Sequence, residues 1–380
     1  AMSQKSSEMK AQGIDVINMS VGEPDFMTPD HVKEAGKKAI DDNFSKYSPV
    51  PGYPVLREAI VKKLKQENHL DYAVSEIVVG TGGKQGVCNA ILALVNPGDE
   101  VVIPAPYWVS YPQMVKLAGG VPVIVSAGIE QDFKITAEQL EHAITPKTKM
   151  IILCSPSNPT GSVYSAEELE SLAKVVLAHD DLFVLSDEIY EHINYIGGHC
   201  SIASCQGMKD RTILCNGVSK AYAMTGWRLG WVAAPEWIAK GINKLQGQYT
   251  SGTCSVSQMA AVAAYEADQA CVADYREAFR RRRDLIVRLA KEIPGLEVNV
   301  PQGAFYLFPK CSSYFGKTDG KHVIRSSSDL AMYILEEGGV ATVGGDAFGA
   351  PECFRMSYAT SDDNIKEALR RIKEVLSKLK

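Results

Sequence analysis

Alternation between short apolar runs and longer helical patterns is the feature that most constrains the fold of this chain. From Val78 onward, runs of Val, Ile, Leu and Ala are separated by amphipathic stretches such as residues 85–95 and 166–178. The predicted strands are Glu76–Gly80, Glu100–Pro104, Val121–Val125, Lys149–Cys154, Leu182–Ser186, Thr212–Asn216 and Gly230–Ala234. Because each is nearly continuous in apolar residues, we expect helices to cover both faces of the sheet. The pattern predicts an α/β fold with a mostly parallel seven-stranded sheet.

After Tyr275 the pattern changes, which indicates a second and smaller unit. A long charged helix is followed by short apolar runs and two further helical stretches. The chain has 380 residues, and at roughly 150 residues per domain this length predicts two or three folded units. We predict a large domain over residues 32–285 and a smaller α+β domain that both chain ends form, from residues 1–31 and 286–380.

Charge and cysteine content argue against several classes of partner. Lys and Arg total 40 against 45 Asp and Glu, a net charge of −5, so no positive field favours nucleic acid or an anionic membrane. No uncharged apolar stretch reaches the roughly 20 residues of a membrane helix. The nine cysteines contain no C-x-x-C pair, and the seven histidines no H-E-x-x-H element. We therefore predict reduced thiols, no metal and a cytoplasmic location.

Three of the predicted strands end in unusually polar sequences. Ligands of an open parallel sheet bind in the crevice outside the carboxyl ends of its strands. The side chains expected to converge there are Asn158, Asp187, Tyr190 and Lys220. An amide, a carboxylate, a phenol and an amine suit neither hydride transfer nor a Ser-His-Asp hydrolase, and the chain has no G-x-S-x-G elbow. The set suits a cofactor that needs an imine-forming lysine and a carboxylate beneath a ring nitrogen.

A glycine-rich turn and two arginines are candidate anion-binding groups. Residues 81–84 (TGGK) join a predicted strand to a helix, so their backbone N–H groups can surround a phosphate. The stretch matches neither the Walker pattern nor G-x-G-x-x-G, and a simple tight turn is the alternative. Arg228 offers a planar fork to a phosphate, or forms a surface ion pair. Arg355 lies among apolar residues and needs a partner if it is buried, for which a substrate carboxylate is one possibility.

Taken together, these residues resemble the fold-type I pyridoxal-phosphate enzymes, specifically the class I/II aminotransferases of the aspartate aminotransferase family and their bacterial and thermophilic subgroup. The resemblance covers nearly the whole chain. Its stretches, in order, are Val21–Phe26, Lys46–Tyr47 with Gly52 and Leu56–Glu58, Pro106–Trp108, Asn158–Gly161, Asp187–Tyr190, Ser219–Lys220 with Gly226–Arg228, Gly303–Tyr306 and Arg355–Tyr358. One such stretch is weak evidence, whereas eight in order are specific.

The resemblance implies that pyridoxal 5'-phosphate is the cofactor and assigns catalytic residues. Lys220 would bind the cofactor covalently and, as a free amine, move the substrate proton. Asp187 would keep the ring nitrogen protonated, because an opposite charge favours the charged form. Asn158 and Tyr190 would hydrogen-bond the phenolic oxygen of the ring, and Trp108 would stack on its face.

The resemblance also assigns the phosphate site and an oligomeric state. Gly83, Lys84 and Arg228 would border the phosphate. Tyr47 would reach it from the neighbouring subunit, which implies a homodimer with shared active sites. A serine that many relatives carry three residues before the lysine is Gly217 here, so backbone groups would have to replace its hydroxyl.

The substrate site that the resemblance implies consists of Gly22, Lys84, Trp108, Asn158 and Arg355. Arg355 would bind the substrate α-carboxylate through two nitrogens. The enteric and animal enzymes bind the distal carboxylate with an arginine of the partner subunit, but residues 246–269 contain neither Arg nor Lys. In the other subgroup a lysine after the glycine pair takes this role, which makes Lys84 the candidate.

The expected function is transfer of the amino group of L-aspartate or L-glutamate to 2-oxo acids, 2-oxoglutarate or oxaloacetate, by a ping-pong route. An aromatic, prephenate or alanine aminotransferase, or a lyase of the same fold, remains open because fold and cofactor do not fix the substrate. A non-catalytic pyridoxal-phosphate sensor is a different class. Such proteins carry a DNA-binding module, for which this chain has no basic helix-turn-helix segment.

Overall fold

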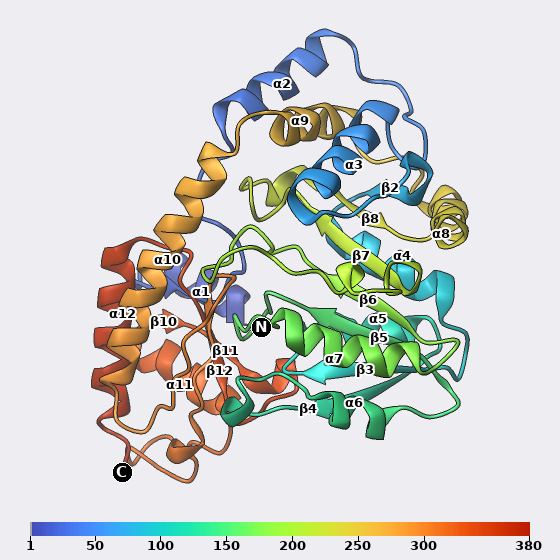
Figure 1. The fold of residues 1–380 in the computed structure, drawn as a ribbon. Helices are drawn as coiled ribbons and strands as arrows, with labels where there is room; N and C mark the ends of the chain where they lie inside the picture. Colours follow the sequence, from blue (N-terminus) through green and yellow to red (C-terminus); the bar gives the residue numbers. More distant parts are fainter. Residues whose placement is uncertain (1) are drawn as a thin grey trace.

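The computed structural model describes residues 2–380 as a large central sheet with helices and a smaller unit beside it (Figure 1). The sheet has the order β2-β8-β7-β6-β5-β3-β4. Its strands are β2 (Ile77–Gly80), β3 (Glu100–Ala105), β4 (Val121–Ser126), β5 (Thr148–Cys154), β6 (Phe183–Asp187), β7 (Thr212–Gly217) and β8 (Gly230–Ala233). β8 pairs antiparallel with β2 and β7, and the other pairs are parallel. The predicted sheet is confirmed.

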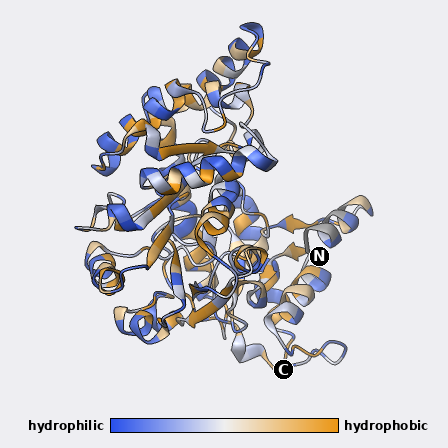
Figure 2. Ribbon diagram, turned by 90° about the vertical axis from the view of Figure 1, so that its right-hand side faces the viewer, coloured by the Kyte–Doolittle hydropathy of each residue, from blue (hydrophilic) through white to orange (hydrophobic). Residues whose placement is uncertain are grey.

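Helices cover both faces of this sheet, as its apolar strands predict. One face packs against α4 (Gly83–Leu94), α5 (Tyr111–Leu117) and α8 (Glu236–Tyr249). The other face packs against α3 (Pro54–Asn68), α6 (Ala137–Ala143), α7 (Ala166–Leu177) and α9 (Ser255–Glu266), with α2 (Asp30–Asp41) lying on α9. In Figure 2 the strands are largely hydrophobic, whereas the helices carry both colours. An outer helix such as α7 buries one apolar stripe and leaves a polar one outside, whereas α9, which α2 covers, exposes only Glu266 among its residues.

The strand β4 departs from the expectation that every strand is covered on both faces. It is the last strand of the sheet and pairs only with β3. Val121 is 47% exposed and Ile124 is 41% exposed. A run of β-branched residues fits an edge strand as well as a central one, so composition does not distinguish the two positions.

The smaller unit combines segments from both ends of the chain. Its helices are α1 (Met2–Ala11), α10 (Ala270–Lys291), α11 (Ser327–Gly338) and α12 (Asp362–Leu376), and its strands are β1 (Ile17–Asn18), β9 (Tyr306–Leu307), β10 (Val340–Ala341), β11 (Val343–Gly344) and β12 (Phe354–Ser357). β1 pairs parallel with β10, so the N-terminal chain joins the C-terminal segments (Figure 1). β11, β12 and β9 form an antiparallel sheet. The division at residues 32 and 285 stays a prediction.

Buried charges anchor the loop after β6 to the helix behind it. Lys63 of α3 forms a buried ion pair with Glu191, whose Oε1 also accepts a hydrogen bond of 2.8 Å from Asn216 at the end of β7. Burial alone would raise the pKa of Glu191, but Lys63 holds it well below its ordinary value. The neighbouring Glu188 pairs with His199 at 2.7 Å. Because these two carboxylates are held by partners inside the protein, the loop has a fixed course across the edge of the sheet.

Two further observations bear on the predicted partners. No helix within residues 2–380 combines the length and the apolar composition needed to cross a membrane. Two groups of acidic and histidine side chains share Glu191, one with Glu67 and His192 and one with Glu188 and His199. Because the ammonium group of Lys63 already pairs with Glu191, these groups have an internal cation. The absence of a metal stays a prediction.

Candidate active site

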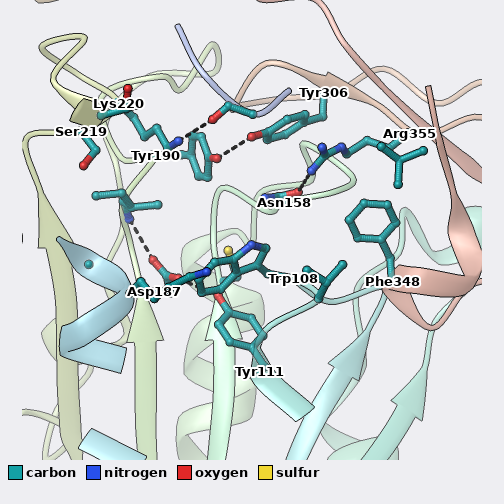
Figure 3. A pocket seen from close by; sticks show the side chains of 18 of the residues that line it. Trp108, Tyr111, Asn158, Asp187, Tyr190, Ser219, Lys220, Tyr306, Phe348 and Arg355 are labelled. Carbon is teal, nitrogen blue, oxygen red and sulfur yellow. Dashed lines mark hydrogen bonds between the residues drawn. The ribbon is translucent and has the colours of Figure 1, made fainter. Parts of the chain in front are cut away.

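A cavity of about 430 Å³ lies at the carboxyl ends of β5, β6 and β7, beside the smaller unit (Figure 3). Asp187 is the last residue of β6 and lies in register with Cys154 of β5 and Cys215 of β7. The predicted site residues that line the cavity are Gly22, Gly83, Lys84, Trp108, Asn158, Asp187, Tyr190, Lys220, Arg228 and Arg355. The convergence predicted from the strand ends is therefore observed. Tyr47 lies outside the cavity and is 98% exposed.

Lys220 follows β7 and points its amine into the cavity. Its Nζ donates a hydrogen bond of 2.6 Å to the carbonyl oxygen of Gly22. Burial lowers the pKa of Lys220 from 10.5 to about 8, an effect that Glu23 opposes and that the positive charges of Arg355 and Arg228 reinforce. A larger share of the amine is therefore neutral near pH 8, which is the state that a nucleophilic lysine needs.

Asp187 is a buried carboxylate that pairs with no cationic side chain within residues 2–380. Its Oδ2 accepts a hydrogen bond of 2.7 Å from the hydroxyl of Tyr111, and its Oδ1 accepts one of 3.3 Å from the backbone of Ile189. Burial raises the pKa of Asp187, and these two hydrogen bonds oppose the rise. A buried carboxylate of this kind is costly unless a positive group from a ligand meets it.

The turn before α4 has the properties of an anion cradle. Gly82 has φ of 82°, and a Cβ there would lie 2.5 Å from Nη2 of Arg228. The helix begins at Gly83, so its unpaired N–H groups face the same space as this guanidinium. Gly217 also excludes a side chain, because its Cβ would lie 2.7 Å from Cα of Gly230. The missing serine at this position thus follows from close packing of two strands.

Arg355 of β12 is held between two aromatic rings. The guanidinium carbon lies 4.6 Å from the ring centre of Tyr306 and 4.9 Å from that of Phe348. Its Nη1 donates to Oδ1 of Asn158 at 2.8 Å, and its Nη2 donates to the carbonyl of Ser20 at 2.6 Å. Its Nε is buried and has no hydrogen-bond partner within residues 2–380. A fixed guanidinium with an unused buried donor suits a carboxylate of the substrate.

Trp108 and Lys84 meet on one wall of the cavity. The Nζ of Lys84 lies 4.9 Å from the ring centre of Trp108. The ring of Trp108 packs edge to face on Tyr111, with centroids 5.3 Å apart. The lysine is therefore close to the aromatic wall as well as to the helix start that forms the cradle.

Sequence reasoning assigned no role to three aromatic residues of the cavity. Tyr111 lies three positions after Trp108, a spacing that places both on one side of a helical turn and that would have signalled a shared site. Tyr306 belongs to Gly303–Tyr306, one of the stretches on which the resemblance is based, but the resemblance assigned it no role. Phe348 lies in a short 3-10 helix after β11, and nothing in its local sequence indicates a site.

Comparison with known proteins agrees with this geometry. The family model described as aminotransferase class I and II matches residues 14–372. The aspartate/prephenate aminotransferase of Cereibacter sphaeroides is 49% identical over 375 residues, covering 98% of this chain and 94% of the relative. The crystal structure of the aspartate aminotransferase from Rhizobium meliloti has a TM-score of 0.96 at 44% identity, covering 100% of this chain and 96% of that one. The Thermus thermophilus aspartate aminotransferase with maleate has a TM-score of 0.93 at 40% identity, covering 98% and 95%.

The chain belongs to the class I and II aminotransferase family. It is a transaminase that depends on pyridoxal 5'-phosphate, and the resemblance stated from the sequence is confirmed. The residues of the cavity fit this cofactor. Asp187 has no cationic side chain paired with it in the described part of the chain, Gly82 and Gly83 leave space at a helix start, and Lys220 is an amine with a lowered pKa.

The lowered pKa of Lys220 predicts unusual reactivity in the cofactor-free protein. A short pulse of acetic anhydride at a series of pH values should modify Lys220 with a midpoint near pH 8, because burial favours its neutral form. Lys37 is an internal reference, since its hydrogen bond to Glu34 raises its pKa and it should react only at higher pH. Peptide mass spectrometry measures both, and equal midpoints for the two lysines would contradict the lowered pKa.

Proposed function

We propose that this enzyme transfers the amino group of L-aspartate or L-glutamate to a 2-oxo acid, 2-oxoglutarate or oxaloacetate, by a ping-pong route. The observation that carries the proposal is one cavity holding an amine, a buried carboxylate and an unpaired guanidinium donor, on Lys220, Asp187 and Arg355. The relative from Cereibacter sphaeroides is named for aspartate and prephenate, and maleate, a dicarboxylate, accompanies the Thermus thermophilus enzyme.

When bound, pyridoxal phosphate supplies an electron sink for the negative charge that develops at the substrate α-carbon. Asp187 holds a proton at the ring nitrogen, because its buried charge is stabilised only when a positive group faces it. Lys220, with its lowered pKa, takes a proton from the α-carbon through Nζ and returns one at the next step. Asn158 and Tyr190 would hold the cofactor by hydrogen bonds to its phenolic oxygen, and Trp108 would pack against its ring.

One end of the cavity binds the cofactor phosphate, and the other end binds the substrate. Arg228 and the backbone N–H groups of Gly83 and Lys84 border the phosphate, at a helix start that favours negative charge. Arg355 binds the α-carboxylate through its free donor, in a plane fixed by the rings on both sides. The backbone of Gly22 also borders the substrate, since it lines the cavity next to the hydroxyl of Tyr306.

The active unit in this proposal is a homodimer in a cytoplasmic compartment. Tyr47 belongs to a stretch shared with the family, yet its side chain is 98% exposed in the single chain. Contact with the phosphate site of a second copy would explain both facts, with Tyr47 of the partner subunit completing each site. All nine cysteines are free, which suits a reducing compartment. The net charge of −5 gives no reason to expect nucleic acid or membrane as a partner.

Prephenate is the second candidate for the oxo-acid substrate. The specific observation is the aromatic lining of the cavity beside Arg355, formed by Trp108, Tyr306 and Phe348. Such walls accept a six-membered carbon ring as well as a short aliphatic chain. The name of the Cereibacter sphaeroides relative includes prephenate.

The half-reaction with a single amino acid tests the proposed function directly. Without any oxo acid, L-aspartate should convert the bound cofactor from its aldehyde form to its amine form and release oxaloacetate, as followed by visible absorption and product analysis. Lys220→Ala should lower this rate roughly 10²- to 10⁴-fold, because the proton carrier is lost. Faster conversion by L-phenylalanine than by L-aspartate would move the assignment to aromatic substrates, and a normal rate in Lys220→Ala would overturn the role of the lysine.

Lys84 as the receptor of the distal carboxylate makes a separate prediction. Lys84→Ala should lower kcat/KM for L-aspartate about 10- to 100-fold but change that for uncharged L-alanine less than about threefold, since only aspartate loses a charge partner. Steady-state kinetics with both substrates measures the contrast. An equal loss for both would make Lys84 a phosphate or structural residue.

Shared active sites predict complementation between two weakened chains. Tyr47→Ala should lower activity at limiting cofactor, and Lys220→Ala should lower turnover roughly 10²- to 10⁴-fold. A dimer with one chain of each kind has one site with Lys220 and with Tyr47 from the other chain, so the mixture should regain activity after subunit exchange. Native mass spectrometry separates the mixed dimer from the two homodimers by mass and confirms that it forms. No recovery in mixed dimers would show that Tyr47 does not act across the interface.

A further inference from the structure

A pair of hydroxyl groups spans the cavity between the two sheets. Tyr306 lies on β9 of the small sheet, and Tyr190 lies in the loop after β6 of the central sheet. Their Oη atoms are 2.7 Å apart, within hydrogen-bond distance (Figure 3). Both side chains are buried and both line the cavity. The pair is thus a direct polar contact between elements that carry the cofactor residues and elements that carry Arg355.

Tyr306 also contacts residues that the proposed function places around the substrate. Its ring faces the guanidinium of Arg355, with 4.6 Å between the guanidinium carbon and the ring centre. Its hydroxyl fills the space beside Gly22, where a Cβ would clash with that oxygen. The Tyr306 side chain therefore contacts Arg355, Gly22 and Tyr190. The proposed function places these three residues around the substrate and the cofactor.

The direction of the hydrogen bond between the two hydroxyl groups follows from the role proposed for Tyr190. A phenol has one proton, and Tyr306 is the hydrogen-bond partner of the Tyr190 hydroxyl within residues 2–380. If Tyr190 donates that proton to the phenolic oxygen of the cofactor, its own oxygen can only accept from Tyr306. Burial and the nearby Tyr306 hydroxyl raise the pKa of Tyr190 well above its ordinary value, and burial raises the pKa of Tyr306. Both phenols therefore keep their protons and can donate.

We propose that Tyr306 is a positioning residue that donates its hydroxyl proton to Tyr190, so that the Tyr190 proton is directed at the cofactor, while its ring fixes the plane of Arg355. This inference rests on the proposed function. A donor that itself accepts a hydrogen bond is strengthened, because the two bonds polarise each other in a buried site. The other titratable groups that face Tyr190 are Cys154, Arg355 and Lys220.

Two substitutions of Tyr306 separate its hydroxyl from its ring. In the holoenzyme, Tyr306→Phe keeps the ring over Arg355 but removes the donor to Tyr190. The negative form of the phenolic oxygen of the cofactor is then less stabilised, so the pH midpoint of the visible absorption band should rise. The expected rise corresponds to a roughly three- to tenfold change in proton affinity. Binding of maleate, measured by its effect on the spectrum, should stay within about twofold. Tyr306→Leu should raise the midpoint and also weaken maleate binding roughly tenfold.

The control is a second hydroxyl pair that lies outside the cavity. Tyr358 is fully buried, and its hydroxyl donates to the carbonyl of Ala304 at 3.2 Å and lies 3.3 Å from that of Tyr195. Tyr358→Phe removes a buried phenol of the same kind without touching the cavity lining. We expect the midpoint and the maleate affinity of this variant to match the wild type.

The outcomes distinguish this inference from the proposed function. An unchanged midpoint in Tyr306→Phe, or an equal shift in Tyr358→Phe, would overturn the role of Tyr306 and leave the aminotransferase assignment intact. If the wild type forms no visible band with pyridoxal phosphate, or does not transfer the amino group of aspartate, the proposed function itself fails. If Tyr306→Leu does not fold, the pH midpoint of Tyr306→Phe still tests the role of the Tyr306 hydroxyl.

Discussion

The buried charge of Asp187 is the constraint on which the rest of the site depends. A carboxylate at the end of a central strand, surrounded by apolar residues of three strands, is stable only if donors and a positive group meet it. Within residues 2–380, the hydroxyl of Tyr111 and the backbone N–H of Ile189 are the donors that meet it, and a positive group is left for a ligand to supply. The cavity thus has an uncompensated negative charge at Asp187, which a protonated ring nitrogen would neutralise.

The fold keeps this site in place through anchors that lie outside the cavity. Glu188 and Glu191 lie on either side of the lining residues Ile189 and Tyr190, and each is held by its own buried partner, His199 or Lys63. Close packing of glycines between β7 and β8 brings the turn before α4 up to the same edge. The small sheet then contributes Arg355, so that the cavity forms where the two units meet.

Much of the fold was predictable because the physical signals are local. Apolar runs on both faces of each strand, helical periodicity and polar strand ends follow from neighbouring residues, and they placed Asn158, Asp187, Tyr190 and Lys220 at one edge. The edge position of β4 was not predictable, because β-branched runs suit edge and central strands alike. Tyr47 shows a different limit, since the single chain leaves it exposed and its predicted role needs a second copy.

The sequence by itself determined the class of chemistry, since an amide after β5, a carboxylate and a phenol after β6 and an amine after β7 must share an edge of a parallel sheet. It also determined the family, through stretches whose order and spacing are specific. Only the tertiary structure decided which partners those groups have: the donor to Asp187, the two rings around Arg355 and the hydroxyl pair of Tyr190 and Tyr306. These contacts join residues far apart in the chain, and packing between the two sheets brings them within hydrogen-bond distance.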